Sequence, residues 1–314
     1  MAETHAAYQP LPLPAAALTV PGVLARLEPP QGLTAPLVVD SPHSGRHYPD
    51  DFGFAAPLDI LRRAEDAFVD ELFASAPRHG AALLVALFPR SYIDPNRHEH
   101  DLDTGLLGEP WPYPARPSER SARGLGLVRR LVRRDVPVYD RLLTAAEVAA
   151  RIARCHRPYH DALADLIGRA HSHFGAVWHL NCHSMRSHAR LSGGRRVPRA
   201  DFVLGDLDGT SCDAAFTRFV AETLRDLGYS VAVNRPFKGA ELVRRHGRPA
   251  EGRHSLQIEV NRGLYMDEAR IEKNDRFAAV QRDMDRLLAA LAAYAREACA
   301  AGALARATAD RAGR

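Results

Sequence analysis

The stretch PLVVDSPHSG, residues 36–45, joins a short apolar run to a polar segment that contains His43. Runs of the same kind recur along the chain, and segments with a helical period separate several of them. The further runs are AALLVALF (81–88), AVWHLN (176–181), DFVLGD (201–206), YSVAVN (229–234) and SLQIEV (255–260). Strands that alternate with helices form largely parallel sheets. We therefore predict an α/β fold with a single domain, in which helices flank a mixed, mostly parallel sheet.

Three longer segments, at 143–170, 210–229 and 267–300, carry the apolar period of amphipathic helices. The second of them offers Thr210 or Ser211 as its N-cap, because a hydroxyl there can accept a hydrogen bond from the first helical turn. We expect these helices to cover the faces of the sheet.

The two ends of the chain differ in composition from the rest. Residues 1–34 are rich in Ala and Pro, and residues 301–314 are small and charged, so we expect a flexible tail at each end and a folded domain at 35–300. The loop at 94–125 is rich in Pro, Gly, Arg and acidic residues. It is longer than a plain connection needs to be, and we expect it to cover a site.

Composition excludes several classes of protein. The chain has 314 residues, 46% of them hydrophobic, which is enough for a large core, and its formal net charge is only +4. A charge this mild predicts no nucleic-acid partner. The 4 cysteines form no C-x-x-C pair, and no apolar stretch reaches the length of a membrane span. We expect a cytoplasmic protein without a membrane partner, while the oligomeric state is left open.

Polar residues lie at or just after the predicted strands, where α/β sheets bind their ligands. His43 and His183 follow two of the apolar runs, and Glu259 lies within the last one, on the opposite face from its apolar neighbours. The segment AEDAFVDEL adds carboxylates at three positions, Glu65, Asp66 and Asp70. Two imidazoles, one carboxylate and a further glutamate outside the ligand set suit a catalytic zinc site.

Such a metal lowers the pKa of its bound water to about 7, so hydrolysis needs no protein nucleophile. The chain has no G-x-S-x-G motif, no P-loop and no G-x-G-x-x-G after a strand. The sequence therefore favours metal-assisted hydrolysis over serine-hydrolase or nucleotide chemistry.

In these residues the chain resembles the N-formylglutamate amidohydrolase family, whose fold is related to that of zinc carboxypeptidases. The resemblance spans roughly residues 35–290 and rests on eight motifs in one order. They are SPHSG (41–45), EDAFVDEL (65–72), SYIDPNR (91–97), RPYHDAL (157–163), NCHSM (181–185), DFVLGDLDGTSC (201–212), NRPFKGAELVRRHG (234–247) and LQIEVNRGLYMDE (256–268).

The resemblance implies a metal held by His43, His183 and an acid of the ED pair. Asp66 is preferred as the third ligand, and Glu65 is the alternative. The expected ion is Zn²⁺, with Co²⁺ or Mn²⁺ as replacements. Glu259 matches the family's strand carboxylate and is expected to be the general base.

Residues around the ligands are expected to support them. Metal-bound imidazoles commonly give their other ring nitrogen to a carboxylate, and Asp40 is a candidate for this role towards His43. His47 and His160 are expected either to support the site from behind or to lie on the surface.

The substrate implied by the resemblance, N-formylglutamate, carries two carboxylates, and the planar fork of arginine matches a carboxylate with two parallel hydrogen bonds. Arg97 is favoured because it lies just beyond a strand end, with Asn96 beside it as a polar contact. Asn234 and Lys238, in the motif NRPFKGAEL, are expected to hold the amino-acid part.

We therefore predict metal-dependent hydrolysis of N-formyl-L-glutamate, or a closely related N-acyl amino acid, to formate and L-glutamate. The attacking group is metal-activated water, and Glu259 is the general base. One alternative is a carboxypeptidase-like hydrolase of another N-acyl amino acid or small peptide. The other is a non-catalytic protein that binds an acidic partner through basic surface such as RRLVRRD (129–135).

Overall fold

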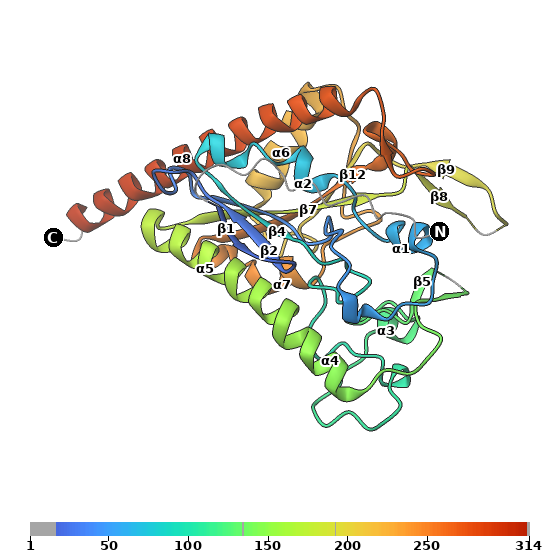
Figure 1. The fold of residues 1–314 in the computed structure, drawn as a ribbon. Helices are drawn as coiled ribbons and strands as arrows, with labels where there is room; N and C mark the ends of the chain where they lie inside the picture. Colours follow the sequence, from blue (N-terminus) through green and yellow to red (C-terminus); the bar gives the residue numbers. More distant parts are fainter. Residues whose placement is uncertain (1–16, 134, 192, 313–314) are drawn as a thin grey trace.

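The computed structural model describes residues 17–133, 135–191 and 193–312 of the chain. Its centre is an eight-stranded sheet in which sequence neighbours are often separated in space (Figure 1). From one edge to the other the strands are β1 (Ala17–Val20), β2 (Leu24–Leu27), β4 (Ala82–Ala86), β3 (Leu37–Ser41), β7 (Val177–Met185), β12 (Arg253–Asn261), β10 (Phe202–Gly205) and β11 (Val231–Val233).

The sheet is mixed and mostly parallel. The central strands β4, β3, β7 and β12 are parallel to one another, and β10 is parallel to β11 but antiparallel to β12. At the other edge, β1 and β2 join in antiparallel pairing. All six apolar runs singled out in the sequence form strands. The predicted fold class is confirmed.

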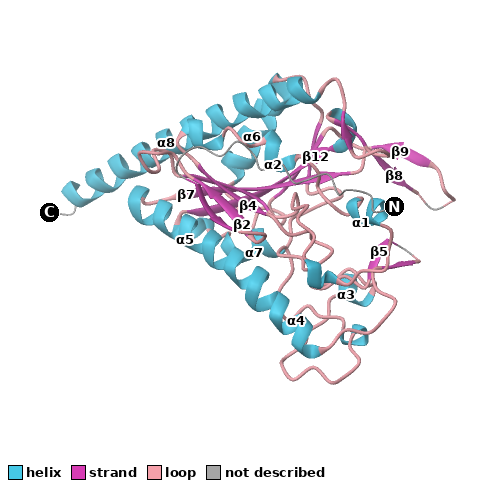
Figure 2. Cartoon of the chain, in the orientation of Figure 1, coloured by secondary structure: helices cyan, strands magenta, loops and turns pink. Residues whose placement is uncertain are grey.

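Helices cover both faces of the sheet (Figures 1 and 2). One layer contains α2 (Val69–Leu72), α6 (Ala214–Asp226) and α8 (Phe277–Ala312), and the other contains α4 (Ala145–Arg151), α5 (Arg157–Phe174) and α7 (Glu241–His246). Successive residues of β3 serve opposite layers, since Val38 packs in the cluster that includes α5 and Val39 in the cluster that includes α8. A strand apolar on both faces is what a sheet buried between two layers requires.

Shorter elements lie around the open end of the sheet, where loops dominate (Figure 2). The short helices are α1 (Leu58–Arg62) and α3 (Glu119–Ala122), and a π-helical turn at Ile152–His156 joins α4 to α5. The outlying strand pairs are β5 (Leu131–Arg133) with β6 (Val136–Pro137), β8 (His188–Arg190) with β9 (Arg196–Pro198), and β13 (Met266–Asp267) with β14 (Glu272–Lys273).

The expected tails differ from what the structure shows. Residues 17–34 were predicted to belong to a flexible tail, but β1 and β2 extend the sheet within them, and residues 1–16 lie outside the described part. The prediction failed because the alternation in β2 is short and its burial comes from pairing with β4, which is far along the chain. At the other end, α8 continues to Ala312, beyond the predicted helix end at 300.

The N-cap of α6 also differs from the prediction. The cap is Asp213, whose side chain accepts a hydrogen bond from the backbone N–H of Ala215. Thr210 and Ser211 instead belong to the turn that precedes the helix, where both backbone N–H groups donate to Asp206 O. Several cap-competent residues in a row make the first helical turn hard to place from sequence.

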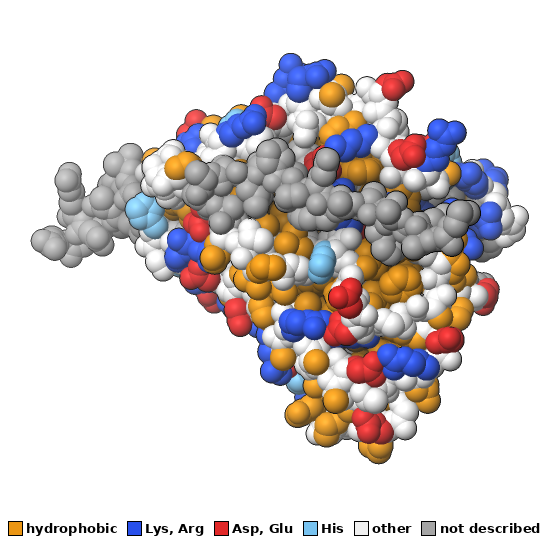
Figure 3. Space-filling view, viewed as in Figure 1, with side chains coloured by type: hydrophobic (Ala, Val, Ile, Leu, Met, Phe, Trp, Pro, Cys, Tyr) orange, Lys and Arg blue, Asp and Glu red, His pale blue; other side chains and the backbone are white. Residues whose placement is uncertain are grey.

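Three properties of the described structure bear on the predictions made from composition. On the face shown in Figure 3, basic and acidic side chains are interspersed, as the mild net charge of +4 suggests. Within the described residues, none of the helices combines the length and apolar character that crossing a bilayer requires. The four cysteines are free thiols.

Candidate active site

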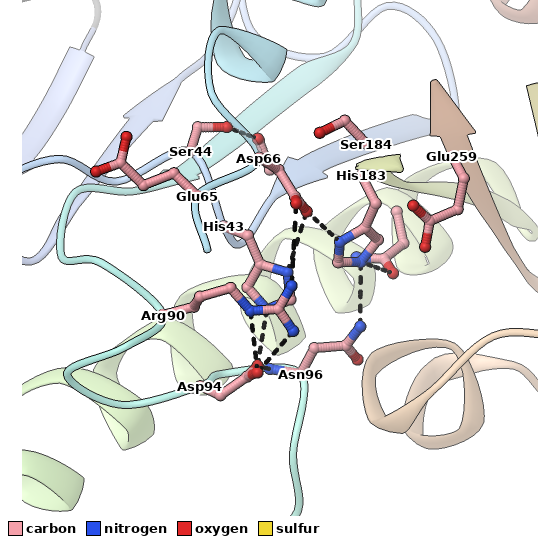
Figure 4. A network of polar contacts seen from close by, with 12 residues as sticks. His43, Ser44, Glu65, Asp66, Arg90, Asp94, Asn96, His183, Ser184 and Glu259 are labelled. Atoms are coloured by element: carbon pink, nitrogen blue, oxygen red, sulfur yellow. Dashed lines mark hydrogen bonds and ion pairs between the residues drawn. The ribbon is translucent and has the colours of Figure 1, made fainter. Parts of the chain in front are cut away.

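Three buried side chains from separate elements meet at the carboxyl ends of the central strands (Figure 4). His43 follows β3, His183 lies in β7, and Asp66 lies in the turn before α2. Asp66 Oδ2 is 3.2 Å from Nδ1 of His43 and 3.0 Å from Nδ1 of His183. The residues His43, His183 and Asp66 are 1%, 3% and 2% exposed. The structure thus brings together the three residues that the sequence singled out as metal ligands.

The opposite ring nitrogens of the two histidines face hydrogen-bond acceptors. His43 Nε2 donates to Asp94 Oδ1 at 2.7 Å, and His183 Nε2 donates to Asn181 Oδ1 at 2.8 Å. The Asn181 amide is oriented because its Nδ2 donates to Asp40 Oδ1 at 2.8 Å. With the proton on each Nε2, each Nδ1 presents its lone pair to the carboxylate between the rings.

This arrangement fits a divalent metal ion. Two imidazole nitrogens and one carboxylate oxygen, all acceptors, lie within 4.8 Å of one another. Acceptors that converge without a donor repel one another, and a cation between them removes the repulsion. Two histidines and an acid are also the protein ligands of many catalytic zinc sites, and a carboxylate on the outer nitrogen of His43 is the usual orienting partner.

The surroundings of Asp66 keep its carboxyl group in the charged form. Burial alone would raise the pKa of Asp66, but the polar contacts with His183 and His43 and the positive charge of Arg90 outweigh it, so the pKa lies well below its usual range. Arg262 Nη2 also donates to Asp66 Oδ1 at 2.9 Å. One oxygen of Asp66 is therefore anchored by an arginine while the other faces the imidazoles.

The choice between Glu65 and Asp66 is decided by the direction of the two side chains. Glu65 Oε1 accepts a hydrogen bond from Tyr48 Oη at 2.7 Å, away from the histidines (Figure 4). The backbone N–H of Asp66 donates to the carbonyl of His43 at 2.9 Å, which fixes the acid beside that ring. Adjacent residues in a turn point in different directions, so only Asp66 reaches the cluster.

The prediction that Asp40 orients His43 is wrong. Asp40 accepts hydrogen bonds from Tyr159 Oη at 2.7 Å and from His179 Nε2 at 2.9 Å, and so reaches the cluster only through Asn181. Asp94 takes the expected role towards His43.

His160 and His47 were expected either to support the site or to lie on the surface, and the structure shows one of each. His160 is buried, and its Nε2 donates to the carbonyl of Pro95 at 2.9 Å. It therefore supports the segment that carries Asp94 and Asn96. His47 is exposed.

Glu259 lies in β12 directly opposite His183 in the strand pairing, and its carboxylate is drawn facing that ring in Figure 4. Gln257 Nε2 donates to Glu259 Oε1 at 3.0 Å. Burial raises the pKa of Glu259 to about 7, although the neighbouring His183 opposes the shift. A carboxylate with a pKa near neutrality can both accept and return a proton.

A cavity of about 530 Å³ opens onto the cluster and Glu259. Asn96 and Arg97, which were expected to bind substrate, line it. Asn96 Oδ1 accepts from the N–H of Leu242 at 2.9 Å, and its Nδ2 lies 3.1 Å from Nε2 of His183. Arg97 donates through Nε to the carbonyl of Leu125 at 3.4 Å and through Nη1 to the carbonyl of Asn96 at 3.3 Å. No described residue accepts a hydrogen bond from its Nη2.

The other two expected substrate residues are placed differently. Lys238 lines the cavity, but its Nζ pairs with Asp208 Oδ2 at 2.6 Å, and both side chains are more than half exposed. The side chain of Asn234 is engaged with Asp206, accepting from its N–H at 3.1 Å and donating to Oδ1 at 2.7 Å. Asn234 thus holds the turn that leads to residues 236–240, which line the cavity.

Sequence reasoning missed several arginines at the site. Arg90 donates through Nε and Nη2 to Asp94 Oδ2 at 3.2 and 2.7 Å, and Arg262 anchors Asp66. Arg129 was counted only within the basic run at 129–135, and no local pattern marks Arg262. Because arginine is common in this chain, the presence of an arginine does not by itself indicate that it lies at the site.

An α/β sheet that gathers two histidines, an aspartate and a buried glutamate at one cavity has the arrangement of a hydrolytic enzyme. Known proteins identify the group more closely. The chain belongs to the N-formylglutamate amidohydrolase family, which its residues 35–266 match.

Individual relatives agree with this assignment. The N-formylglutamate deformylase of Pseudomonas aeruginosa is 30% identical over 268 residues, which cover 83% of this chain and 94% of the relative. That of Pseudomonas putida is 28% identical over 272 residues, with the same coverage of 83% and 94%. The crystal structure of N-formylglutamate amidohydrolase from Ralstonia eutropha JMP134 superposes with a TM-score of 0.84 at 48% identity, covering 88% of this chain and 99% of that one.

Proposed function

We propose that this protein hydrolyses N-formyl-L-glutamate to formate and L-glutamate. The observation that carries the proposal is the convergence of His43, His183 and Asp66 beside the buried Glu259, in a chain of this family. The names of the relatives from two Pseudomonas species support the substrate. The mild net charge and the four free thiols agree with a cytoplasmic enzyme.

The metal would be held by His43 Nδ1, His183 Nδ1 and a carboxylate oxygen of Asp66. Zn²⁺ suits this donor set best among common ions, and Co²⁺ or Mn²⁺ can replace it. A bound metal supplies Lewis acidity, which polarises the acyl oxygen and activates water. Asp94 and Asn181 keep the two rings oriented for this role.

Glu259 moves the protons of the reaction. Its carboxylate accepts one proton from the attacking water as the new C–O bond forms at the formyl carbon. The same carboxyl then delivers this proton to the amide nitrogen as the C–N bond breaks, so that formate and the free amine leave. A pKa raised to about 7 suits a group that performs both transfers near neutral pH.

Arginines of the cavity hold the substrate. Arg97 donates to a substrate carboxylate through its Nη2 group. The carbonyls of Leu125 and Asn96 accept hydrogen bonds from Nε and Nη1 of Arg97, and these bonds orient its guanidinium group. Lys238 sits at the rim, where its pairing with Asp208 makes it a weaker contact.

Formate release from N-formyl-L-glutamate tests the proposal directly. We expect purified protein to contain a divalent metal, to release formate, and to lose both properties on treatment with a chelator and regain them when Zn²⁺ is added. N-acetyl-L-glutamate and N-formyl-L-leucine serve as comparison substrates. Faster turnover of either one would favour the alternative of a hydrolase for another N-acyl amino acid, and bound metal without any hydrolysis would favour a binding protein.

A further inference from the structure

The cavity carries far more positive than negative charge. Among the described residues that line it, nine are Lys or Arg, whereas the acidic ones are Asp66 and Glu259. Asp66 is already paired with Arg262 and faces the histidines. Three of the cations, Arg90, Arg262 and Lys238, are paired with acids, and the positive charge that remains suits a ligand with more than one negative group.

Arg129 is a buried arginine of the cavity whose side chain makes no hydrogen bond to any described residue. Its residue is 8% exposed, its Nε is buried without a hydrogen-bond acceptor, and its Nη2 is 3.8 Å from Asp94 Oδ2, beyond hydrogen-bond distance. Asp94 is already satisfied, because Arg90 donates two hydrogen bonds to Oδ2 and His43 donates one to Oδ1. Asp94 therefore does not explain why a guanidinium is buried here.

A buried guanidinium N–H without an acceptor destabilises the folded protein unless a ligand supplies the acceptor. Burial, together with the like charges of Arg90 and Arg97, lowers the pKa of Arg129 from its usual value. The group still carries its charge at neutral pH. Arg129 and Arg97 both line the cavity, and their positive charges are close enough to repel each other.

We propose that Arg129, together with Arg97, binds the side-chain carboxylate of the substrate and so selects glutamate-type N-acyl amino acids over uncharged ones. This inference rests on the proposed function and adds the residue that reads the second carboxylate. A carboxylate between the two guanidinium groups accepts hydrogen bonds from both and relieves their mutual repulsion.

Binding of the amino-acid product tests this independently of turnover. Calorimetric titration with L-glutamate and with L-glutamine, which lacks only the side-chain charge, is compared for the wild type, Arg129→Gln and Arg129→Lys, all loaded with Zn²⁺. We expect Arg129→Gln to weaken L-glutamate binding by about ten- to a hundredfold while L-glutamine binding changes less than about threefold. Arg129→Lys keeps the charge but not the fork and should fall between the two.

The matched control is Arg130→Gln. Arg130 is the next residue, but its Nε donates to Asp103 Oδ2 at 2.8 Å and it does not line the cavity. We expect its ligand preference to match the wild type. Equal losses for both amino acids in Arg129→Gln, or no loss for either, would overturn the assignment.

Thermal unfolding of the ligand-free proteins separates binding from a structural role. Because Arg129 lacks a close acceptor, Arg129→Gln should unfold at the same temperature as the wild type or higher, whereas loss of a structural arginine lowers it. A lowered Tm with unchanged ligand preference refutes the inference. If wild-type protein prefers L-glutamate but releases no formate, the proposed reaction fails and the carboxylate site stands. If the wild type releases formate but does not prefer L-glutamate, only the carboxylate-site inference is refuted.

Discussion

Replacing Glu259 by glutamine removes proton transfer while keeping almost everything else about the site. The side chain is 9% exposed and accepts a hydrogen bond from Gln257 Nε2 at 3.0 Å, which a glutamine oxygen can also accept. Shape and volume are nearly unchanged. The three predicted metal ligands do not include this residue, so Glu259→Gln should keep its metal.

The expected loss follows from the role of a general base. Positioned acid–base groups contribute about 10²- to 10⁴-fold, so kcat for N-formyl-L-glutamate should fall by that factor or more, equivalent to ~3–5 kcal/mol in the barrier. KM should change little, because the amide still fills the same space beside His183. The pH dependence near neutrality that belongs to this carboxyl should also disappear.

The assay is coupled detection of formate, with metal content measured on the same samples. Glu241→Gln is the matched control, because Glu241 is also a buried glutamate but pairs with Arg244 and does not line the cavity. Retained metal with near-normal hydrolysis would refute the mechanism. Lost metal would instead make Glu259 a ligand and reopen the assignment of Asp66.

Other substitutions test the surroundings. His43→Ala and His183→Ala should each lose the bound metal, about one ion per chain, and full occupancy in either folded variant would exclude that ligand. Asp94→Asn should weaken metal affinity about 10- to 100-fold in chelator competition, since it orients His43; unchanged affinity would assign the orientation elsewhere. Asp70→Asn concerns stability. Burial raises the pKa of Asp70 to about 6 from 3.8, so the acid favours folding below pH 4 and this advantage is lost as pH rises to 6. The variant should therefore gain up to ~3 kcal/mol over the wild type at pH 7 in urea unfolding, with no gain at pH 4. A gain that is independent of pH would contradict this.

The sequence by itself predicted six strands of the central sheet and singled out the residues of the candidate site. Six short apolar runs form strands, and in β3 five consecutive residues are all buried. The motifs also brought His43, His183, Asp66 and Glu259 to attention, because such residues at strand ends are costly to bury without a purpose. The strands β1 and β2, next to one edge of the sheet, were missed, since four-residue strands carry too little pattern to stand out.

Only the tertiary structure decided which of several similar residues contacts which partner. Glu65 and Asp66 are adjacent and chemically alike, yet one turns to Tyr48 and the other to the histidines, where Arg262, 196 residues away in the chain, holds it. Likewise, the packing of distant segments brings Asp94, and not Asp40, within hydrogen-bond distance of His43. Local patterns fix local structure because they depend on backbone geometry a few residues long. The partner of a buried charge is fixed by contacts between distant segments, and among many similar acids and arginines no short-range rule ranks those contacts.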